Sequence, residues 1–312
     1  MSKLLLVDGS ALLHRAYHAY PPLTTKTGEV VGAVYGVVSM LISALEQEQP
    51  TSVVVAWDLP KPTFRHVRYV GYKAQRPKAD LELVEQIPLV KRAIEKMGLT
   101  QVEQEGFEAD DIIGTLSKQG DKFFKKDKLE EVIILTGDQD TMQLVSESVR
   151  VLTPAKGGNG AKLYGPEEVI EKYGVRPDQI VDYKALIGDS SDNIPGVAGI
   201  GPVTAGKLIR EYESLEGVYK AIDSGKFEEQ FKGEVKRKLV EGKESALLSQ
   251  ELSLIETEMK LKVRPVEWEY QGLESEELRQ ELEELGFKSL VRRVWGVREE
   301  PKAENTNQMG LF

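Results

Sequence analysis

Aspartates follow three short apolar runs, each of which is typical of a buried strand. The runs and the acids after them are KLLLV with Asp8, SVVVAW with Asp58, and EVIILTG with Asp138 and Asp140. Buried parallel strands read as continuous apolar runs, and α/β sheets gather ligands at the carboxyl ends of their strands. We therefore predict that these acids meet at one edge of a parallel sheet.

Two more acidic clusters bring the number of candidate carboxylates to nine. They are Glu108, Asp110 and Asp111 in GFEADDIIG, and Asp189 and Asp192 in IGDSSDN. Neighbouring carboxylates cannot all stay ionised unless strong positive charge lies among them. Because the candidate ligands are all oxygen, the pattern indicates hard divalent cations, Mg²⁺ or Mn²⁺, and two or more of them. Such ions most often act on phosphate esters, where a pair can activate water and stabilise the leaving oxygen.

Taken one at a time, the same acids have ordinary structural explanations. Acids in the first turn of a helix, as at Glu108 to Asp111, gain roughly 0.3–1 kcal/mol each from the helix dipole. Asp8 or Asp58 alone could cap a helix or a turn. Five independent caps at strand ends and helix starts explain the pattern less well than one shared metal site, and we favour the metal site.

A basic segment covers residues 59–79, LPKPTFRHVRYVGYKAQRPKA. It holds six lysines and arginines, interleaved aromatic side chains and no acid. Aromatic rings can stack on bases while Lys and Arg follow phosphates, so the segment is typical of an element that grips a nucleic-acid strand. A solvated surface loop is the alternative. If the segment folds over the acids, Lys73 and Arg76 would stabilise charge on a reacting phosphate, and Arg65 and Tyr72 would contact DNA.

Three glycines, Gly196, Gly199 and Gly201, lie between two helix-like stretches, PDQIVDYKALIGD and VTAGKLIREY. A helix, a glycine turn and a second helix present backbone N–H groups and a helix N-terminus to a phosphate. Such contacts, to which Lys207 would add a charge, position a duplex backbone without reading its bases. A tight turn between helices is the alternative. A dinucleotide-binding fingerprint would need a strand, not a helix, before the glycines.

Composition sets few further limits. The 312 residues suffice for a large α/β domain with a smaller appendage, and the absence of cysteine excludes disulfides and cysteine-bound metals. No stretch approaches the roughly 20 apolar residues of a membrane helix, so we expect a cytoplasmic protein. The formal net charge is −10. It does not exclude a nucleic-acid partner, because the nine candidate ligands carry most of it and the local field decides binding.

The predicted fold class is α/β, with a mostly parallel central sheet flanked by helices over residues 1–175 and a helical region over residues 176–296. The polar tail, residues 297–312, lacks periodicity and is expected to be disordered. The elements expected from periodicity are helices over residues 34–45, 81–97 (with Pro88 as a kink) and 108–124, strands over 132–136 and 149–153, a loop over 157–160 and an extended piece over 261–270.

Seven stretches, running in order from residue 3 to about 210, resemble the 5′-nuclease (flap endonuclease) family, most closely the 5′→3′ exonuclease domains of bacterial DNA polymerases I and their stand-alone relatives. Weaker similarity continues to about residue 296. The stretches are LLLVDGSALLHRAYHA, TTKTGEVVGAVYG, WDLPKPTFRH, GYKAQRP, GFEADDIIGTL, ILTGDQDTMQL and DYKALIGDSSDNIPGVAGIGPVTAGKLI.

The resemblance implies a PIN-like nuclease core, a helical arch at about residues 59–97 and a helix–hairpin–helix motif. It implies that all nine acids bind metal, that Lys73 and Arg76 contact the scissile phosphate beside a stacking Tyr72, and that the glycine hairpin binds DNA and a K⁺ ion. The implied activity is structure-specific 5′→3′ exonuclease or flap endonuclease cleavage of DNA, or of RNA primers, at single-strand/duplex junctions in replication and repair, by a monomer.

The chain ends in QMGLF. Gln308, Leu311 and Phe312 are similar to the short bacterial peptide that binds the sliding clamp, although Met309 replaces the more usual leucine. An arbitrary apolar tail is the alternative. The peptide favours a stand-alone protein over a fragment of a polymerase.

Two other functions compete with the nuclease. A haloacid-dehalogenase-like phosphatase also uses strand-end aspartates and Mg²⁺, but it needs D-x-D after the first strand, where this chain has Asp8-Gly9-Ser10. A non-catalytic binder of DNA junctions would not need an intact set of acids. We therefore favour the nuclease.

Overall fold

The computed structural model describes residues 2–123, 129–154, 161–228, 231, 233–261 and 268–296, and the structural statements below concern these residues. The predicted loop over residues 157–160, most of the extended piece over 261–270, and the tail with Gln308, Leu311 and Phe312 lie outside them.

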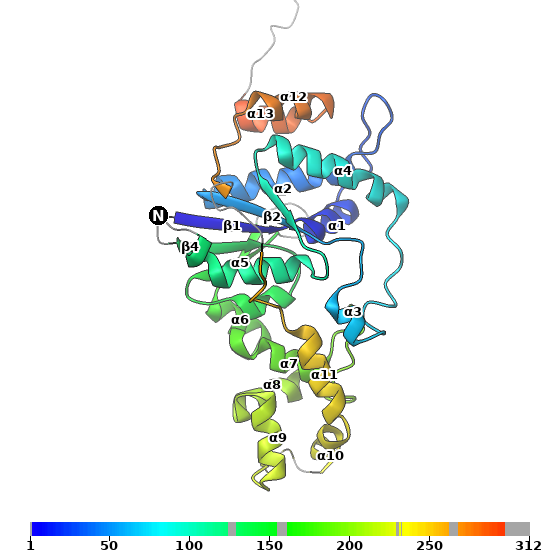
Figure 1. The fold of residues 1–312 in the computed structure, drawn as a ribbon, viewed down its shortest axis with the longest axis vertical. Helices are drawn as coiled ribbons and strands as arrows, with labels where there is room; N and C mark the ends of the chain where they lie inside the picture. The colour runs from blue at the N-terminus through cyan, green and yellow to red at the C-terminus, as the bar shows by residue number, and fades with distance from the viewer. Residues whose placement is uncertain are drawn as a thin grey trace, which may run out of the picture.

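Six strands form one sheet in the order β3-β2-β1-β4-β5-β6 (Figure 1). Neighbouring strands run parallel, except that β6 runs antiparallel to β5. This confirms the predicted α/β class with a mostly parallel sheet. The chain order reverses between β1 and β4, which makes their carboxyl ends the switch point of the sheet. The strands are β1 Ser2–Asp8, β2 Ser52–Trp57, β3 Thr100–Glu103, β4 Leu129–Leu135, β5 Val149–Pro154 and β6 Ala161–Tyr164.

The sheet separates two hydrophobic cores. Successive side chains of a strand point to opposite faces, so Leu5 and Val7 enter one core while Leu4 and Leu6 enter the other. Because both faces are covered, the central strands are apolar at every position, which explains the uninterrupted runs in the sequence. The helices of the first core are α1 Gly9–Ala19, α2 Gly32–Glu48, α4 Leu81–Lys96, α12 Glu276–Glu284 and α13 Lys288–Trp295.

The opposite face is covered by α5 and by the helices that follow the sheet (Figure 1). Of the short 3₁₀ turns on this side, Asp140–Leu144 lies between β4 and β5, and Pro177–Gln179 lies between two of the helices. The helices on this side are α5 Ala109–Phe123, α6 Pro166–Tyr173, α7 Ile180–Ile187, α8 Pro202–Tyr212, α9 Leu215–Asp223, α10 Glu234–Glu241 and α11 Lys243–Ser253.

The basic segment forms only a short helix, α3 (Phe64–Arg68), followed by turns that lead into α4. Pro60, Pro62 and Pro77 flank this short helix, and prolines of this kind interrupt a continuous helix. The predicted helices over residues 34–45, 81–97 and 108–124 correspond to α2, α4 and α5, with Pro88 inside α4. The short strands β3 and β6 were missed, because sequences such as TQVE lack an apolar run. Within the described ranges, no helix is long and apolar enough to cross a membrane.

The central strand β4 generates a test of the two-core fold. Ile133 is fully buried, so Ile133→Ala should lower the free energy of unfolding by about 2–5 kcal/mol in urea denaturation. Val70 lies in the basic segment and is 92% exposed, so Val70→Ala should change the same quantity by less than about 0.5 kcal/mol. Equal effects of the two substitutions would contradict the assignment of β4 to the core.

Candidate functional site

Asp8 is both the last residue of β1 and the N-cap of α1. Its Oδ1 accepts a hydrogen bond from the Ala11 backbone N–H at 2.8 Å, and its Oδ2 accepts one from the Thr136 hydroxyl at 2.8 Å. Thr136 directly follows β4, so its hydroxyl ties the ends of the two neighbouring strands together. The side chain is only 4% exposed. Burial and the charge of Asp58 raise the pKa of Asp8 to about 7.

Asp58 and Asp138 follow β2 and β4 and are fixed by neighbouring backbone. Asp58 Oδ1 accepts from the Ala109 N–H at 2.8 Å, at the start of α5. Asp138 Oδ1 accepts from the Asp140 N–H at 2.8 Å, while its own N–H donates to the Thr136 hydroxyl at 2.9 Å. Burial raises the pKa of Asp138, against the attraction of Lys184.

Asp110 lies in the first turn of α5 and faces the three strand-end acids. Its Oδ1 is buried and has no hydrogen-bond partner within the described part of the chain. Burial and then the charges of Asp138, Asp8 and Asp58 raise its pKa well above the ordinary value. Asp8, Asp58, Asp110 and Asp138 therefore form one repulsive group, hereafter the open cluster, at the predicted edge of the sheet.

Glu108 and Asp192 face cations of the basic segment instead. Lys73 Nζ donates to Glu108 Oε1 at 3.0 Å, and the Arg76 guanidinium donates to Asp192 Oδ1. The Tyr72 hydroxyl lies between the two acids, at 2.9 Å from Glu108 Oε2 and 3.0 Å from Asp192 Oδ2. The basic segment thus lies beside these two acids, with Lys73 and Arg76 paired to them. Burial alone would lower the pKa of Lys73, but the charges of Glu108 and Asp192 raise it.

The position of Tyr72 differs from the expected one. Its side chain is 3% exposed and its ring packs edge-on against His66, with centroids 5.2 Å apart. A ring in this position holds two acids by its hydroxyl and presents no open face to a base. Stacking on a base would require Tyr72 to leave this position.

Asp140 and Asp189 share a lysine that sequence reasoning missed. Lys184 of α7 is 8% exposed, and its ammonium donates to Asp140 Oδ1 and, at 2.8 Å, to Asp189 Oδ2. Burial alone would raise the pKa of Asp189, but Lys184 and two hydrogen bonds from Ser191 lower it to about 2. The available signal was a lysine inside the otherwise apolar stretch YKALI, which must pair with an acid if it is buried.

The position of Arg65 also differs from the expected one, because a side chain that contacts DNA should face solvent and Arg65 is buried. Its side chain is 3% exposed and its guanidinium forms a two-pronged ion pair with Asp111, with both N···O distances at 2.8 Å. Asp111 is fully buried. In this position Arg65 cannot contact DNA, contrary to the expectation for the basic segment.

The open cluster fits divalent cations by the chemistry of its donors. All four side chains are carboxylates, and one of their oxygens, Oδ1 of Asp110, has no hydrogen-bond partner in the described part of the chain. The pKa values of Asp8, Asp110 and Asp138 are raised by burial and by neighbouring charge. A hard cation would remove that repulsion. In the part of the chain that the structure describes, no three acid or histidine side chains already surround one point as ligands. Glu108, Asp140, Asp189 and Asp192 instead face Lys73, Lys184 and Arg76.

The glycine hairpin lies between α7 and α8, as predicted. Gly196 and Gly199 have positive φ angles of 63° and 76°, whereas Gly201 has a φ of −99° and caps α8. Gly196 packs directly on Gly188: a Cβ at position 196 would lie 2.3 Å from the Gly188 nitrogen. Lys207 is exposed on α8. The hairpin therefore presents Gly201, the N-terminus of α8 and Lys207 at the surface.

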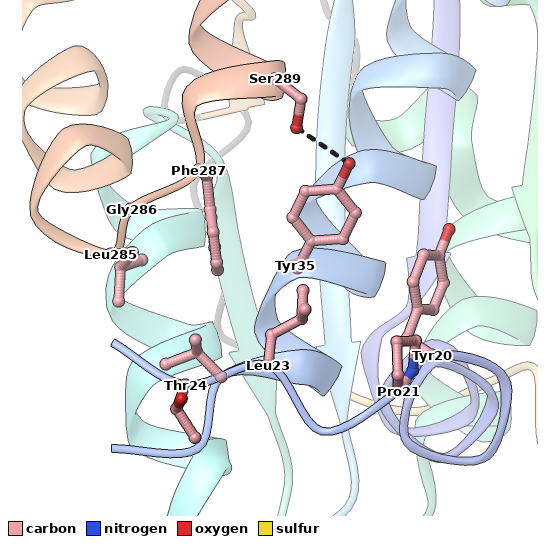
Figure 2. A pocket seen from close by; sticks show the side chains of 10 residues that line it. Tyr20, Pro21, Leu23, Thr24, Tyr35, Leu285, Gly286, Phe287 and Ser289 are labelled. Carbon is pink, nitrogen blue, oxygen red and sulfur yellow. Dashed lines mark hydrogen bonds between the residues drawn. The ribbon is translucent and has the colours of Figure 1, made fainter. Parts of the chain in front are cut away.

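A cavity of about 450 Å³ lies elsewhere, between the segment after α1 and the turn that joins α12 to α13 (Figure 2). Tyr20, Leu23 and Phe287 point into it, and the Tyr35 and Ser289 hydroxyls hydrogen-bond at 3.1 Å across its side. None of the candidate site residues that the structure describes lines this cavity.

The fold and the site define a class of α/β proteins that gather carboxylates at the switch point of a parallel sheet and carry a helical region beside it. The family follows from the sequence as a whole. Residues 3–174 match the model of the 5′-3′ exonuclease N-terminal resolvase-like domain, and residues 175–276 match that of the 5′-3′ exonuclease C-terminal SAM fold. The chain belongs to the 5′-3′ exonuclease family.

Among its curated relatives, the chain is 42% identical to DNA polymerase I of Bacillus subtilis (strain 168) over 94% of its length and 32% of the relative. It is also 42% identical to the thermostable DNA polymerase I of Thermus thermophilus, over 96% of the chain and 34% of the relative. The chain thus spans about a third of the length of these relatives.

Two solved structures show the same fold. T5 5′-exonuclease with bound divalent metal ions (zinc) superposes with a TM-score of 0.65 at 25% identity, over 82% of this chain and 90% of that one. The catalytic core of Rad2 in complex with a DNA substrate gives a TM-score of 0.57 at 14% identity, over 95% and 88% of the two chains.

The contact between Gly188 and Gly196 generates a prediction. Gly196→Ala should lower the free energy of unfolding by about 2–4 kcal/mol, because the new Cβ needs a strained backbone and meets the Gly188 nitrogen. The matched control is Gly201→Ala, which has open space around its Cβ and should change stability by less than about 0.5 kcal/mol. Chemical denaturation of both variants measures the difference, and an unchanged Gly196→Ala variant would refute the close packing.

Proposed function

We propose that the chain is a divalent-metal-dependent nuclease that hydrolyses DNA phosphodiesters at single-strand/duplex junctions and proceeds from 5′ ends. The observation that carries the proposal is the open cluster, where buried carboxylates repel one another at the carboxyl edge of the sheet. Membership in the 5′-3′ exonuclease family supports the reaction and its direction.

Mg²⁺ is the proposed ion, with Mn²⁺ as a substitute. Asp8, Asp58, Asp110 and Asp138 would hold one ion, and Glu108, Asp140, Asp189 and Asp192 would contribute to it or to a second. The oxygen-only donors support this choice, and T5 5′-exonuclease, which shares the fold, binds divalent metal ions. When bound, such ions supply an activated water and neutralise charge on the phosphate.

The cations of the basic segment would bind and orient the scissile phosphate. Lys73 and Arg76 already lie within hydrogen-bond distance of Glu108 and Asp192, so a phosphate that approaches these acids meets both cations. If metal ions neutralise the acids, Lys73 and Arg76 become free to pair with phosphate oxygens. In a site with little water, this charge stabilises the transition state more than the ground state.

The glycine hairpin would hold the duplex next to the reaction. Gly201, the N-terminus of α8 and the exposed Lys207 offer backbone N–H groups and one cation to phosphates. A K⁺ ion at the hairpin carbonyls is part of this proposal, and its support is the family resemblance of GVAGIGP. Contacts of this kind read the shape of the backbone, which suits cleavage that depends on structure rather than on sequence.

Cleavage of a labelled 5′-flap DNA tests the proposed reaction. The protein should release the flap with Mg²⁺ or Mn²⁺ and lose the activity in a chelator. Asp138→Asn should lower the cleavage rate by at least about 10²-fold while flap binding persists, because one charged oxygen donor is lost. Asp223→Asn, which changes an exposed acid of α9, is the matched control and should cleave at the normal rate. Full activity of Asp138→Asn, or in chelator, would refute the metal assignment.

The terminal peptide generates a separate prediction. We propose that Gln308, Leu311 and Phe312 bind a bacterial sliding clamp, and the support is their sequence alone. Deletion of residues 307–312 should abolish clamp binding in surface plasmon resonance and leave cleavage of free flaps unchanged. Equal clamp affinity with and without these residues would remove the proposal, and so would no measurable affinity of the full chain.

A further inference from the structure

Arg65 uses every hydrogen-bond donor of its guanidinium inside the protein. Nε donates to the Leu252 carbonyl at 3.0 Å, and Nη2 donates to the Leu254 carbonyl at 2.8 Å. The remaining donors go to Asp111 Oδ1 and Oδ2, both at 2.8 Å, and to Glu108 Oε2 at 3.4 Å. An arginine has five such N–H groups, so none is left for a phosphate.

The carboxylate of Asp111 likewise has all of its hydrogen-bond acceptor positions occupied inside the protein. Its Oδ1 accepts from Arg65 and from the Glu256 N–H at 2.9 Å, and its Oδ2 accepts from Arg65 and from the Glu108 N–H at 3.0 Å. A carboxylate offers about four lone-pair directions, and all of them are taken here. The neighbouring Asp110 is the opposite case, because among the described residues its buried Oδ1 has no hydrogen-bond partner.

We infer that Asp111 is not a metal ligand and that Arg65 and Asp111 form a clasp. The clasp joins three chain segments: α3 in the basic segment, the first turn of α5, and the end of α11 with the chain just after it, which runs back past α5 in Figure 1. With Asp111 excluded, eight of the nine acids predicted from the sequence remain as candidate metal ligands.

The clasp positions the groups proposed to act on the phosphate. Arg65 also touches Glu108, which accepts from Tyr72 and Lys73. Five residues beyond α3, the Lys73 backbone N–H donates to the Asp192 carbonyl at 2.9 Å and so docks this turn on the loop that carries Asp192. With α3 fixed by Arg65, the ammonium of Lys73 has a defined place. Arg65 is thus a positioning residue for the basic segment, and its effect on cleavage rests on the proposed function.

Two adjacent substitutions on one helix turn test the inference. Asp111→Asn should keep Mn²⁺ affinity within about twofold of the parent, measured by calorimetry or electron paramagnetic resonance, because its oxygens face Arg65 and backbone donors. Its Tm without metal should fall by about 5–10 °C, because the amide leaves the buried guanidinium without its charge partner. Asp110→Asn should show the reverse, with Mn²⁺ affinity lowered by more than about tenfold and a Tm that is unchanged or raised, because repulsion is relieved.

A second pair of variants separates positioning from bulk stability. Arg65→Met should increase amide hydrogen exchange over residues 69–76 while β1 and β4 keep their protection. Arg65→Lys, which retains the charge, should restore part of that protection. On flap DNA, both variants should lower kcat more than they raise KM, since the proposed role is to place Lys73 for the reacting phosphate.

The outcomes distinguish the clasp from the proposed function. If Asp111→Asn loses Mn²⁺ affinity as Asp110→Asn does and keeps its Tm, Asp111 is a ligand and the clasp is wrong. Unchanged exchange over residues 69–76 in Arg65→Met would also overturn the positioning role. Unchanged Mn²⁺ affinity in both aspartate variants would refute the proposed metal site, while the Tm fall of Asp111→Asn would still support the clasp.

Discussion

The repulsion between carboxylates at one edge of the sheet is the constraint on which the rest of the structure depends. Asp8, Asp110 and Asp138 have raised pKa values because they are buried close to like charges. A fold left to optimise stability alone would not keep them together. They stay because β1, β4 and α5 all present an end to the same edge, where backbone N–H groups hold Asp8, Asp58 and Asp138 in place.

The protein's own lysines and arginines neutralise some of these acids and leave the others without a paired cation among the described residues. Lys184 bridges Asp140 and Asp189, and Lys73 and Arg76 reach Glu108 and Asp192 from the other side. The open cluster receives no such cation by direct contact within the described residues. The acids thus fall into a group that the protein neutralises and a group whose charge an external cation would balance. The boundary between the two groups runs through α5, between Asp110 and Asp111.

Much of the fold could be predicted from the sequence, because it follows from local periodicity. The apolar runs of β1, β2, β4 and β5 and the periodic stretches of α2, α4 and α5 each indicate their structure without help from the rest of the chain. The acids at the strand ends could also be placed together, because parallel strands share an edge.

The partners of those acids could not be predicted, because they come from distant segments. Nothing near Asp111 in the sequence indicates that Arg65, 46 positions earlier, will take both its oxygens. Nothing near Asp189 indicates that Lys184 will also reach Asp140. Side-chain pairing across elements depends on how helices dock, and the residue types alone allow both a metal ligand and an ion pair. Tyr72 shows the same ambiguity, since an aromatic ring in a basic segment suits stacking on a base as well as a buried hydroxyl bridge.

The loop between α7 and α8 connects the two halves of the proposed machinery. Asp192 touches the basic segment, and Gly196, only four residues later, is locked against Gly188 in the hairpin. Four residues of extended chain span at most about 14 Å, so the contact at Asp192 and the hairpin cannot lie farther apart than that. Under the proposed function, the place of the cut would be measured from the point where the duplex is held. A change in the length of this loop would then move the cut along the DNA without altering a single catalytic group.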